Sequence, residues 1–539
     1  MLKSIAILIR EYCRHVCALM KVDAPTIGRI APGRMVALLL LAAVLTPAQT
    51  QAQAQAQTQT PKNIIILFAD GAASTQFEFG RYSSEVLRGK PFAVTSEVMR
   101  KGVLGLMSTY SNNAYVTDSA AAASAMSTGF KVDNGAISIT PDGVAPPTLM
   151  AVARKQGKKI GLISTATVYD ASPAAFSVHA KSRRDYESIV NQYTALGPEV
   201  LLGGGAEYFK PAGVDGGKRK DKQDVIDVFR QRGYAIARQT ADIADPSNLR
   251  ASKLLGLFAD QDMDFEIDRD AGKQPSLAQM TAAALKVLSA PAAPATPAAP
   301  GAAHTKTPAK LDKGFVLFIE NENTDSAGHA TDVASLMRDL WAFDDAVKVA
   351  LEFRKRHPDT LVIVTGDHET GGFSPTSALR EKGPATPANR LVVTAATLRV
   401  IEGFKMSFQE MSERMDQKAK EGADRDAVMA HLDGLIAQNL PGMKMDDEVR
   451  AMIRDKQLPG LNFFHAPPTP SAALGLMVAR QTGFYWGNAG HTSEPATVSA
   501  IGPGAALFRG YQDNTDFARK LHRLLGVKAA RPEPVRAKP

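Results

Sequence analysis

KNIIILFADG, residues 62–71, is the most informative stretch of this 539-residue chain for predicting its fold. Its six apolar residues, 64–69, follow one another without a polar break, and Asp70 and Gly71 come directly after them. Such a run is typical of a strand that is buried on both faces, as in a parallel sheet. We therefore predict a central strand whose carboxyl end carries Asp70.

Four further stretches repeat this pattern, and we expect each of them to be a buried parallel strand. Between two of them, residues 332–357 place an apolar side chain at every third or fourth position, as in a helix with one buried face. Strands that alternate with helices predict an α/β fold, with a doubly wound, mostly parallel central sheet and helices on both of its faces. The four stretches are residues 158–170, 314–325, 359–372 and 496–504.

The composition is that of a globular chain, with 45% hydrophobic and 22% charged residues. A net charge of +8 and a pI of 9.2 raise the question of a nucleic-acid partner. The positive residues are scattered, however, and no block of Lys and Arg interleaved with aromatic residues occurs. We therefore predict no nucleic-acid site.

The N-terminal part has the features of a secretory signal. Arg34 precedes an apolar run at residues 36–45, and small residues suited to cleavage follow at about 48–54. The run is too short to remain as a permanent membrane anchor. We expect residues 1–54 to be removed and the protein to be periplasmic or secreted. Both cysteines lie in this segment, so no disulfide is expected in the mature chain.

The pattern of strands and helices also divides the chain. Residues 62–383 are expected to form the first part of an α/β core, with a loop rich in Pro and Ala at 290–310. Helical signals replace strand signals at 384–481, which indicates a helical insertion or cap. Residues 482–526 would complete the core, and residues 527–539 would be a disordered basic tail.

Carboxylates and imidazoles gather where the predicted strands end. Taken alone, each acid is as well explained as a helix cap or a turn residue. Together they would repel one another strongly, and a bound cation is the economical resolution. Histidine with carboxylate suits zinc, whereas an all-oxygen set suits magnesium. The residues are Asp70, Glu320, Asp325, His329, Asp367, His368 and His491.

A second feature is the stretch VTDSAAAASAMSTG at residues 116–129, which predicts a helix of small residues. Ser119 would lie at its N-terminus, where backbone N–H groups favour an anion. A serine hydroxyl is a weak nucleophile that needs a base or a metal. No His or Lys is its neighbour in the sequence, so a metal is the activator that the sequence offers.

Seven stretches occur in the order and spacing of the alkaline phosphatase family, and the chain resembles this family over roughly residues 62–510. The resemblance implies hydrolysis of small-molecule phosphate monoesters through a phosphoserine intermediate, with two zinc ions and one magnesium ion. Members are often homodimers, so a homodimer is one expected assembly. The stretches are FADG (68–71), VTDSAAAASAMSTG (116–129), YDASPAAF (169–176), SRRDY (182–186), FIENENTDSAGH (318–329), VTGDHETGG (364–372) and AGHTSE (489–494).

The resemblance also implies a role for individual residues. Ser119 matches the nucleophile and Arg183 the arginine that clamps two phosphate oxygens, which suits a bidentate guanidinium. The ligands of one zinc would be Asp325, His329 and His491, and those of the second would be Asp70, Asp367, His368 and Ser119. Asp70 would bridge to the magnesium, together with Ser172, Glu320 and, through water, Asp170.

The chain departs from the family pattern at three positions. Glu322 competes with Glu320 as the magnesium ligand, although the spacing of five residues to Asp325 favours Glu320. Ser172 stands where threonine is common and keeps the hydroxyl. Ser326 stands where a larger or basic side chain often contacts phosphate through water, and its small size predicts weaker phosphate binding or a broader substrate range.

Three alternatives stay open at this point. Arg184, next to Arg183, is the rival for the phosphate clamp. A phosphodiesterase of the same superfamily would hold a second substituent by loops that the sequence does not define. A non-catalytic periplasmic protein that binds zinc or phosphate would not need both Ser119 and Arg183 in these motif contexts.

Overall fold

The structure is a computed structural model and describes most of the chain after the N-terminal segment. The predictions for the signal segment at 1–54, for nearly all of the Pro/Ala loop at 290–310 and for the tail after residue 527 fall outside the described residues. None of the helices in the described part combines the length and apolarity that crossing a membrane requires. The described residues are 60–245, 251–291, 312–379, 390–455 and 470–527.

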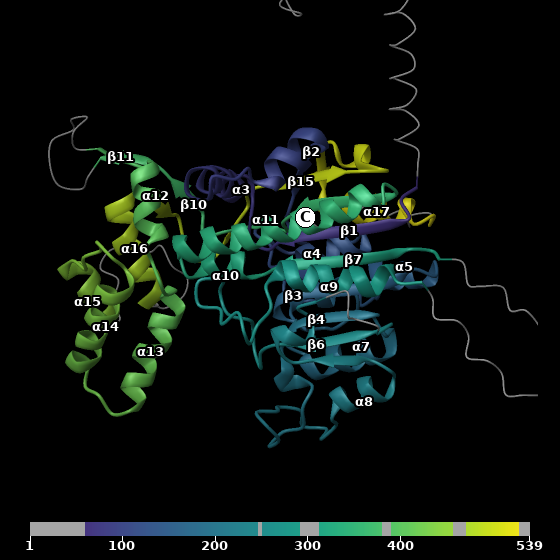
Figure 1. Ribbon diagram of the computed structural model, residues 1–539, viewed down its shortest axis with the longest axis horizontal. Coiled ribbons are helices and arrows are strands. Elements are labelled where there is room, and N and C mark those ends of the chain that lie inside the picture. The colour runs from purple at the N-terminus through teal and green to yellow at the C-terminus, as the bar shows by residue number, and fades with distance from the viewer. Residues whose placement is uncertain (1–59, 246–250, 292–311, 380–389, 456–469, 528–539) are drawn as a thin grey trace, which may run out of the picture. The chain divides into compact units, whose positions relative to one another are not determined.

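One sheet of ten strands organises the fold, in the order β16-β2-β15-β8-β1-β7-β3-β4-β6-β5. In Figure 1 the strands β1, β7, β3, β4 and β6 follow one another down the view in this order. The strand predicted from KNIIILFADG is β1, and it pairs in parallel with β7 and β8 on its two sides. The bounds are β1 Asn63–Ala69, β2 Val103–Ser108, β3 Lys159–Thr167, β4 Val200–Gly204, β5 Ala235–Ala237, β6 Leu254–Leu257, β7 Phe315–Asn321, β8 Thr360–Thr365, β15 Ala496–Ile501 and β16 Gly510–Asp513.

The direction of β15 differs from the prediction. This strand runs antiparallel to both β8 and β2, whereas the sequence pattern led us to expect a parallel strand. The physical reason is that β15 is buried over nearly its whole length. Burial on both faces gives the same continuous apolar run whichever way a strand points. The sheet remains mostly parallel, as predicted.

Both faces of the sheet carry a hydrophobic core. Ile65 and Leu67 of β1 pack into the core formed with α3, α9 and α11, while Ile64 and Ile66 pack into the opposite core with α4, α5, α7, α8 and α17. The alternation follows from the two-residue period of a strand. The doubly wound architecture is therefore confirmed. The bounds are α3 Ser74–Ser83, α4 Ser119–Thr128, α5 Leu149–Lys155, α6 Ala171–Ala175, α7 Tyr186–Leu196, α8 Val225–Gln231, α9 Leu277–Ser289, α10 Asn323–His329, α11 Val333–Arg356 and α17 Asn514–Leu524.

Helix α11 shows how the sequence specifies this packing. The side chains that recur at helical spacing, from Leu336 and Leu340 to Phe343 and Val347, are all buried against the sheet. Burying one such side chain contributes about 1.5–3 kcal/mol. Asp332 caps the helix by accepting hydrogen bonds from the first-turn backbone N–H groups. The helix that follows the metal-ligand candidates is thus fixed at its start.

A group of helices lies between β8 and β15 in the sequence and gathers at the left of Figure 1. Three of them, α13 to α15, occupy the positions at which the sequence predicted helices. The start of α13 is tied to the rest of the protein, because Asp268 accepts a hydrogen bond from the Ser407 N–H at 3.0 Å and Asp332 accepts one from the Phe408 N–H at 2.8 Å. The bounds are α12 Ala395–Glu402, α13 Phe408–Lys420, α14 Arg425–Asn439, α15 Asp447–Asp455 and α16 Pro470–Thr482.

Small strands frame this helical group. The antiparallel pair of β10 (Phe373–Pro375) and β13 (Phe484–Trp486) joins the chain before the group to the chain after it. A second pair, β11 (Ser377–Leu379) with β12 (Arg390–Val392), lies at its beginning. The pairing of β10 with β13 holds the two ends of the helical group close together.

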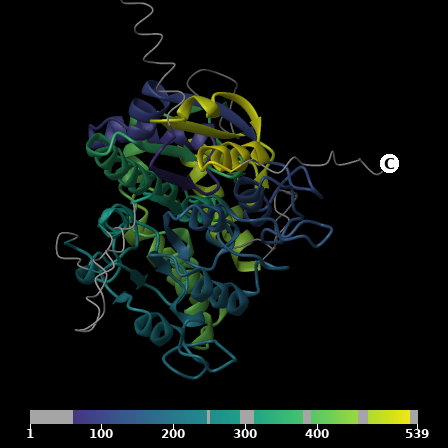
Figure 2. The same cartoon turned by 90° about the vertical axis from the view of Figure 1, so that its right-hand side faces the viewer.

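The two ends of the described chain meet in the sheet. Strand β16 pairs in parallel with β2, and α17 packs against α4. Figure 2 shows these yellow C-terminal elements beside the purple N-terminal ones. The helix that begins at Ser119 is therefore supported from behind by the last helix of the described residues.

Candidate active site

Three buried acids lie at the carboxyl ends of adjacent parallel strands. Asp70 follows β1, Glu320 is near the end of β7, and Asp367 follows β8. Their side chains are almost completely shielded from solvent. This edge is where open α/β sheets bind ligands, and the prediction that polar residues gather there is confirmed for these three.

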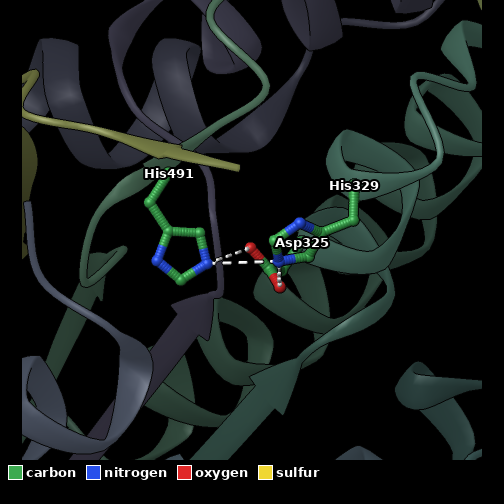
Figure 3. A group of neighbouring side chains, drawn as sticks. All are labelled: Asp325, His329 and His491. Atoms are coloured by element: carbon green, nitrogen blue, oxygen red, sulfur yellow. Dashed lines mark hydrogen bonds and ion pairs between the residues drawn. The ribbon is translucent and has the colours of Figure 1, made fainter. Parts of the chain in front are cut away.

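Asp325 and His329 share one face of α10, which begins directly after β7. His329 Nε2 lies 3.1 Å from Asp325 Oδ2. His491 comes from the far end of the sequence, at the start of β14 (His491–Thr492), which pairs with β9 (Glu369–Thr370). Its Nε2 lies 3.7 Å from Asp325 Oδ1 and 3.2 Å from His329 Nε2 (Figure 3). The three side chains therefore converge on one point.

The hydrogen bonds of the two imidazoles fix their tautomers. His329 Nδ1 lies 2.7 Å from the Ala489 carbonyl oxygen, and His491 Nδ1 lies 2.8 Å from that of Thr117. A carbonyl only accepts hydrogen bonds, so Nδ1 of each neutral ring carries the proton and Nε2 presents a lone pair. Two lone pairs and the carboxylate of Asp325 then face one another. Such a donor set fits a cation, and imidazole with carboxylate fits zinc.

The charges of Asp325 and His329 shift each other's pKa values, and each shift favours the charged form of the group. The carboxylate of Asp325 raises the pKa of His329 to about 9. Burial alone would raise the pKa of Asp325, but the neighbouring histidines lower it below its ordinary range. A positive charge is therefore stabilised at this point, whether a proton or a metal ion supplies it.

A second group surrounds His368. Its Nε2 lies 3.2 Å from Asp367 Oδ2, 3.6 Å from Asp70 Oδ1 and 3.1 Å from Ser119 Oγ. Those two carboxylate oxygens are buried and accept no hydrogen bond from the described part of the chain. Burial and neighbouring carboxylates raise the pKa of Asp70 well above its ordinary value and that of Asp367 to about 7. Orphaned carboxylate oxygens beside an imidazole fit a second cation.

Ser119 is the first residue of α4. Asp118 is the helix cap, since its Oδ1 accepts a hydrogen bond from the Ala121 N–H at 2.9 Å. Ser119 is left to face the site and is almost fully buried. The sequence offered no basic neighbour for Ser119, but the fold brings His368 within 3.1 Å of its hydroxyl.

Arg183 lies beside the start of α4. Its Nη2 is 3.1 Å from Asp170 Oδ1, and its Nη1 is 3.6 Å from Asp118 Oδ2. Its backbone N–H donates to the Gly135 carbonyl at 2.8 Å, which fixes the turn that carries it. The side chain of Arg184 is exposed instead. Of the two arginines, Arg183 is the one whose guanidinium is held by residues around Ser119.

An all-oxygen group adjoins Asp70. The Ser172 hydroxyl, on α6, donates to Asp70 Oδ2 at 3.1 Å. Ser164 donates to Glu320 Oε2 at 2.5 Å, and Glu320 Oε1 accepts no hydrogen bond from the described residues. Burial raises the pKa of Glu320 to about 8, although hydrogen bonds from Ser164 and Ser172 oppose this. Oxygen donors of this kind fit magnesium.

Glu322 faces a different way. Its Oε1 accepts a hydrogen bond from the Ser326 hydroxyl at 2.9 Å. Burial raises its pKa well above the ordinary value, and Asp262 is the carboxylate that adds most to this. The hydroxyl of Ser172 is a neighbour of both Asp70 and Glu320 but not of Glu322. This geometry favours Glu320 over Glu322 as the glutamate that would share a cation with Asp70.

Comparison with known proteins places these groups in a family. The alkaline phosphatase family profile matches residues 61–527. The chain belongs to the alkaline phosphatase family. Alkaline phosphatase 3 of Bacillus subtilis is 29% identical over 474 residues, which cover 86% of this chain and 89% of the Bacillus protein. The streptomycin-6-phosphate phosphatase of Streptomyces griseus is 31% identical over 374 residues, which cover 62% of this chain and 80% of that protein.

The solved structures agree with this membership. The crystal structure of Thermus thermophilus alkaline phosphatase matches with a TM-score of 0.73 at 28% identity, over 88% of this chain and 93% of that one. The family predicted from seven sequence motifs is therefore confirmed. Members of the alkaline phosphatase family are metal-dependent enzymes, and this protein is a phosphoric monoester hydrolase.

The sequence did not single out two alkaline phosphatase residues that position the site. Thr370 donates a hydrogen bond to Asp325 through its hydroxyl. Glu369 is buried and holds β9 against β14, the strand that begins with His491. Both residues lie in the quoted stretch GDHETGG, but nothing in its letters separates them from ordinary turn residues. The donors to Glu369 are Gln76 Nε2 and Thr492 Oγ1, each at 2.6 Å, and the N–H groups of Gly372 and Phe373, each at 3.0 Å.

Proposed function

We propose that this chain hydrolyses small-molecule phosphate monoesters through a phosphoserine formed on Ser119, with two zinc ions and one magnesium ion as cofactors. The observation that carries the proposal is the Ser119 hydroxyl 3.1 Å from His368 Nε2, at a helix N-terminus and beside two groups of convergent donors. A helix N-terminus favours the phosphate anion, and the donor groups favour cations next to it.

The donor groups suggest how the cations would be held. When bound, the ions would act as Lewis acids that make the Ser119 hydroxyl and a water molecule more acidic and offset the charge on the departing oxygen. Asp325, His329 and His491 would hold one zinc, and Asp70, Asp367, His368 and Ser119 the other. Ser172, Glu320 and Asp70 would hold the magnesium, with Asp170 reaching it through water.

The chain's own residues would perform the following steps. Ser119 Oγ would give its proton to water and attack phosphorus opposite the ester oxygen, so that the bond between phosphorus and that oxygen breaks. The departing oxygen would then take a proton from water and leave as the alcohol. Water then attacks the phosphoserine in the same way, which returns Ser119 and releases inorganic phosphate. The backbone N–H groups at the start of α4 face the phosphate oxygens. Arg183 donates two N–H groups to two of these oxygens and so fixes the in-line orientation.

Location and assembly form part of the same proposal. Residues 1–54 would direct export and be removed, so the mature enzyme would act in the periplasm or outside the cell. A homodimer is the assembly that we propose, because members of the family are often dimers. Size-exclusion chromatography with light scattering on the mature chain tests this.

Hydrolysis of p-nitrophenyl phosphate across pH tests the function. The chain without residues 1–54 should be active, lose activity on chelation and regain it with zinc and magnesium. Because the nucleophile must be deprotonated, the rate should rise toward alkaline pH. Ser119→Ala should lower kcat by about a thousandfold or more with the metals still bound, because the phosphoserine can no longer form. A restored wild-type enzyme that releases no phosphate would overturn the proposal.

A further inference from the structure

A cavity of about 520 Å³ adjoins the candidate active site. Its walls come from residues 261–268, which follow β6, and from residues 405–414 at the start of α13. Its floor includes Asn323 and Ser326 of α10, the helix that also carries Asp325. A volume of this size holds a small organic molecule. The proposed mechanism leaves the cavity unused.

Asp262 connects this cavity to the phosphate-binding groups. Its Oδ1 accepts a hydrogen bond from the Thr167 N–H at 2.7 Å, which places it where β3 ends. Its carboxylate is close enough to Asp170 and Arg183 for their charges to act on it. A molecule that fills the cavity would therefore reach Asp262 at the end of β3 and would contact the helix α10, which also carries Asp325.

The cavity is strongly acidic. Of its cationic side chains, Lys405 and Arg414, the second is already paired with Glu410, since Arg414 Nε lies 2.7 Å from Glu410 Oε1. Walls with an excess of one sign of charge concentrate the opposite charge in a cleft. The carboxylates that line the cavity are Asp262, Asp264, Asp268, Glu410 and Glu413.

The spacing of these carboxylates differs from that of the candidate metal sites. Among the described residues, the groups whose ligand atoms converge within 4.8 Å are those of Asp325 with His329 and His491, and of Asp70 with Asp325 and His368. The carboxylates of the cavity form no such group. They are distributed around a space that is large enough for an organic molecule with one or more separated positive charges.

We propose that this cavity binds the alcohol part of phosphate monoesters that carry protonated amines, such as amino sugars. The phosphate would lie at Ser119 and Arg183, and the ammonium groups would face the acidic walls. Each ammonium would form charge-assisted contacts with carboxylates that remain reachable by solvent, among them Asp264 and Glu413. This preference rests on the proposed function and narrows its substrate class.

Matched esters test the preference on the metal-loaded enzyme. Glucosamine 6-phosphate and glucose 6-phosphate share the same ester and differ by one protonated amine, and N-acetylglucosamine 6-phosphate removes that charge again. We expect kcat/KM to be about tenfold higher for the aminated ester, which corresponds to about 1.4 kcal/mol. The preference should shrink at high ionic strength, because salt screens exposed charges.

Variants of the cavity residues test whether its carboxylates cause the preference for the aminated ester. Asp264→Asn combined with Glu413→Gln should bring the ratio of the two kcat/KM values close to one. The ratio is taken within each variant, so a loss of folding or of metal cancels. Glu421→Gln is the matched control, because Glu421 lies at the other end of α13 and does not line the cavity. This control should keep the wild-type ratio.

The outcomes separate this inference from the proposed function. If p-nitrophenyl phosphate is not hydrolysed, the proposed function itself fails. If it is hydrolysed but the amine gives no advantage, the cavity does not select amines and only this inference falls. An advantage that survives the double variant, or that N-acetylglucosamine 6-phosphate shares, also overturns it, since the amine would then be recognised elsewhere or not as a charge.

Discussion

The two histidine-containing donor groups differ in their access to solvent. His368 and its partners Asp70 and Asp367 are at most 1% exposed, whereas 43% of the His329 side chain is exposed. Burial and the charge of His491 lower the pKa of His368 well below its ordinary value, while Asp325 raises that of His329 to about 9. The same edge of the sheet thus forms a buried site, in which the imidazole is neutral, and an accessible site, in which a proton competes with a cation for His329.

The difference in solvent access suggests different roles for the two sites. A buried site that keeps His368 neutral would hold a cation with little exchange, and its imidazole lies 3.1 Å from the Ser119 hydroxyl. The accessible site, around His329, would leave room for an alcohol to depart and for a water molecule to enter. Three measurements test this contrast between the buried and the accessible site.

Removal of a buried ligand should have the largest effect. Asp367→Asn takes away one of the orphaned oxygens beside His368, so we expect kcat/KM to fall by more than about a hundredfold. The same change removes a like charge from Asp70, so the metal-free protein should become more stable. Activity assays and thermal unfolding in chelator measure the two effects. If Asp367→Asn lowered the thermal stability by the same amount with and without metal, the result would contradict our assignment of this cluster as a set of mutually repelling carboxylates that bind a cation.

Glu369 tests the link between the two groups. It follows His368 directly and bonds Thr492, the neighbour of His491, so Glu369→Gln should loosen both groups at once. Outer-shell partners of metal ligands typically contribute 10- to 100-fold, and we expect activity and metal affinity to fall together in this range. The exposed Glu352, on α11, offers Glu352→Gln as a control that should change neither. A loss of activity at full metal occupancy would point to a different role.

The pH dependence of zinc binding should be the most gradual effect, because it builds up one pH unit at a time. The folded pKa of His329, about 9, lies above its ordinary value of 6.5. The proton therefore stabilises the metal-free protein fully below pH 6.5, and this contribution is lost as the pH rises through 9. Zinc must displace that proton, so its affinity for the accessible site should rise by about tenfold per pH unit up to about 9.

Competition with a chelator between pH 6.5 and 10 measures this dependence. His329→Gln should bind zinc more weakly but with a flatter pH profile. The buried site should show no step near 9, because His368 carries no proton there. A step of the same size at both sites would remove the distinction between them.

Sequence patterns specified the framework because burial follows a local period. The apolar run of β1 and the helical spacing of α11 each encode which faces are covered. The direction of β15 was not encoded, because a strand buried on both faces has the same pattern either way. Local periodicity therefore gives elements and layers, but strand direction depends on connections made elsewhere in the chain.

The candidate site residues could be predicted because the sequence motifs that contain them match those of a known family. The pairing of Ser119 with His368 joins residues 249 positions apart, and only the fold brings them together. The supporting roles of Glu369 and Thr370 could not be predicted, because a single sequence does not distinguish these residues from ordinary turn residues. The acidic cavity was equally hidden, since its walls come from segments near 265 and 410.

The position of the C-terminal elements bears on when the enzyme becomes active during its synthesis. His491 and the strands β15 and β16 belong to the last part of the chain, and α17 supports the helix that begins with Ser119. A growing polypeptide that ends before these residues lacks His491, a proposed ligand of the accessible site, and the helix that packs behind Ser119, the proposed nucleophile. We therefore expect phosphatase activity to appear only when nearly the whole chain has been made.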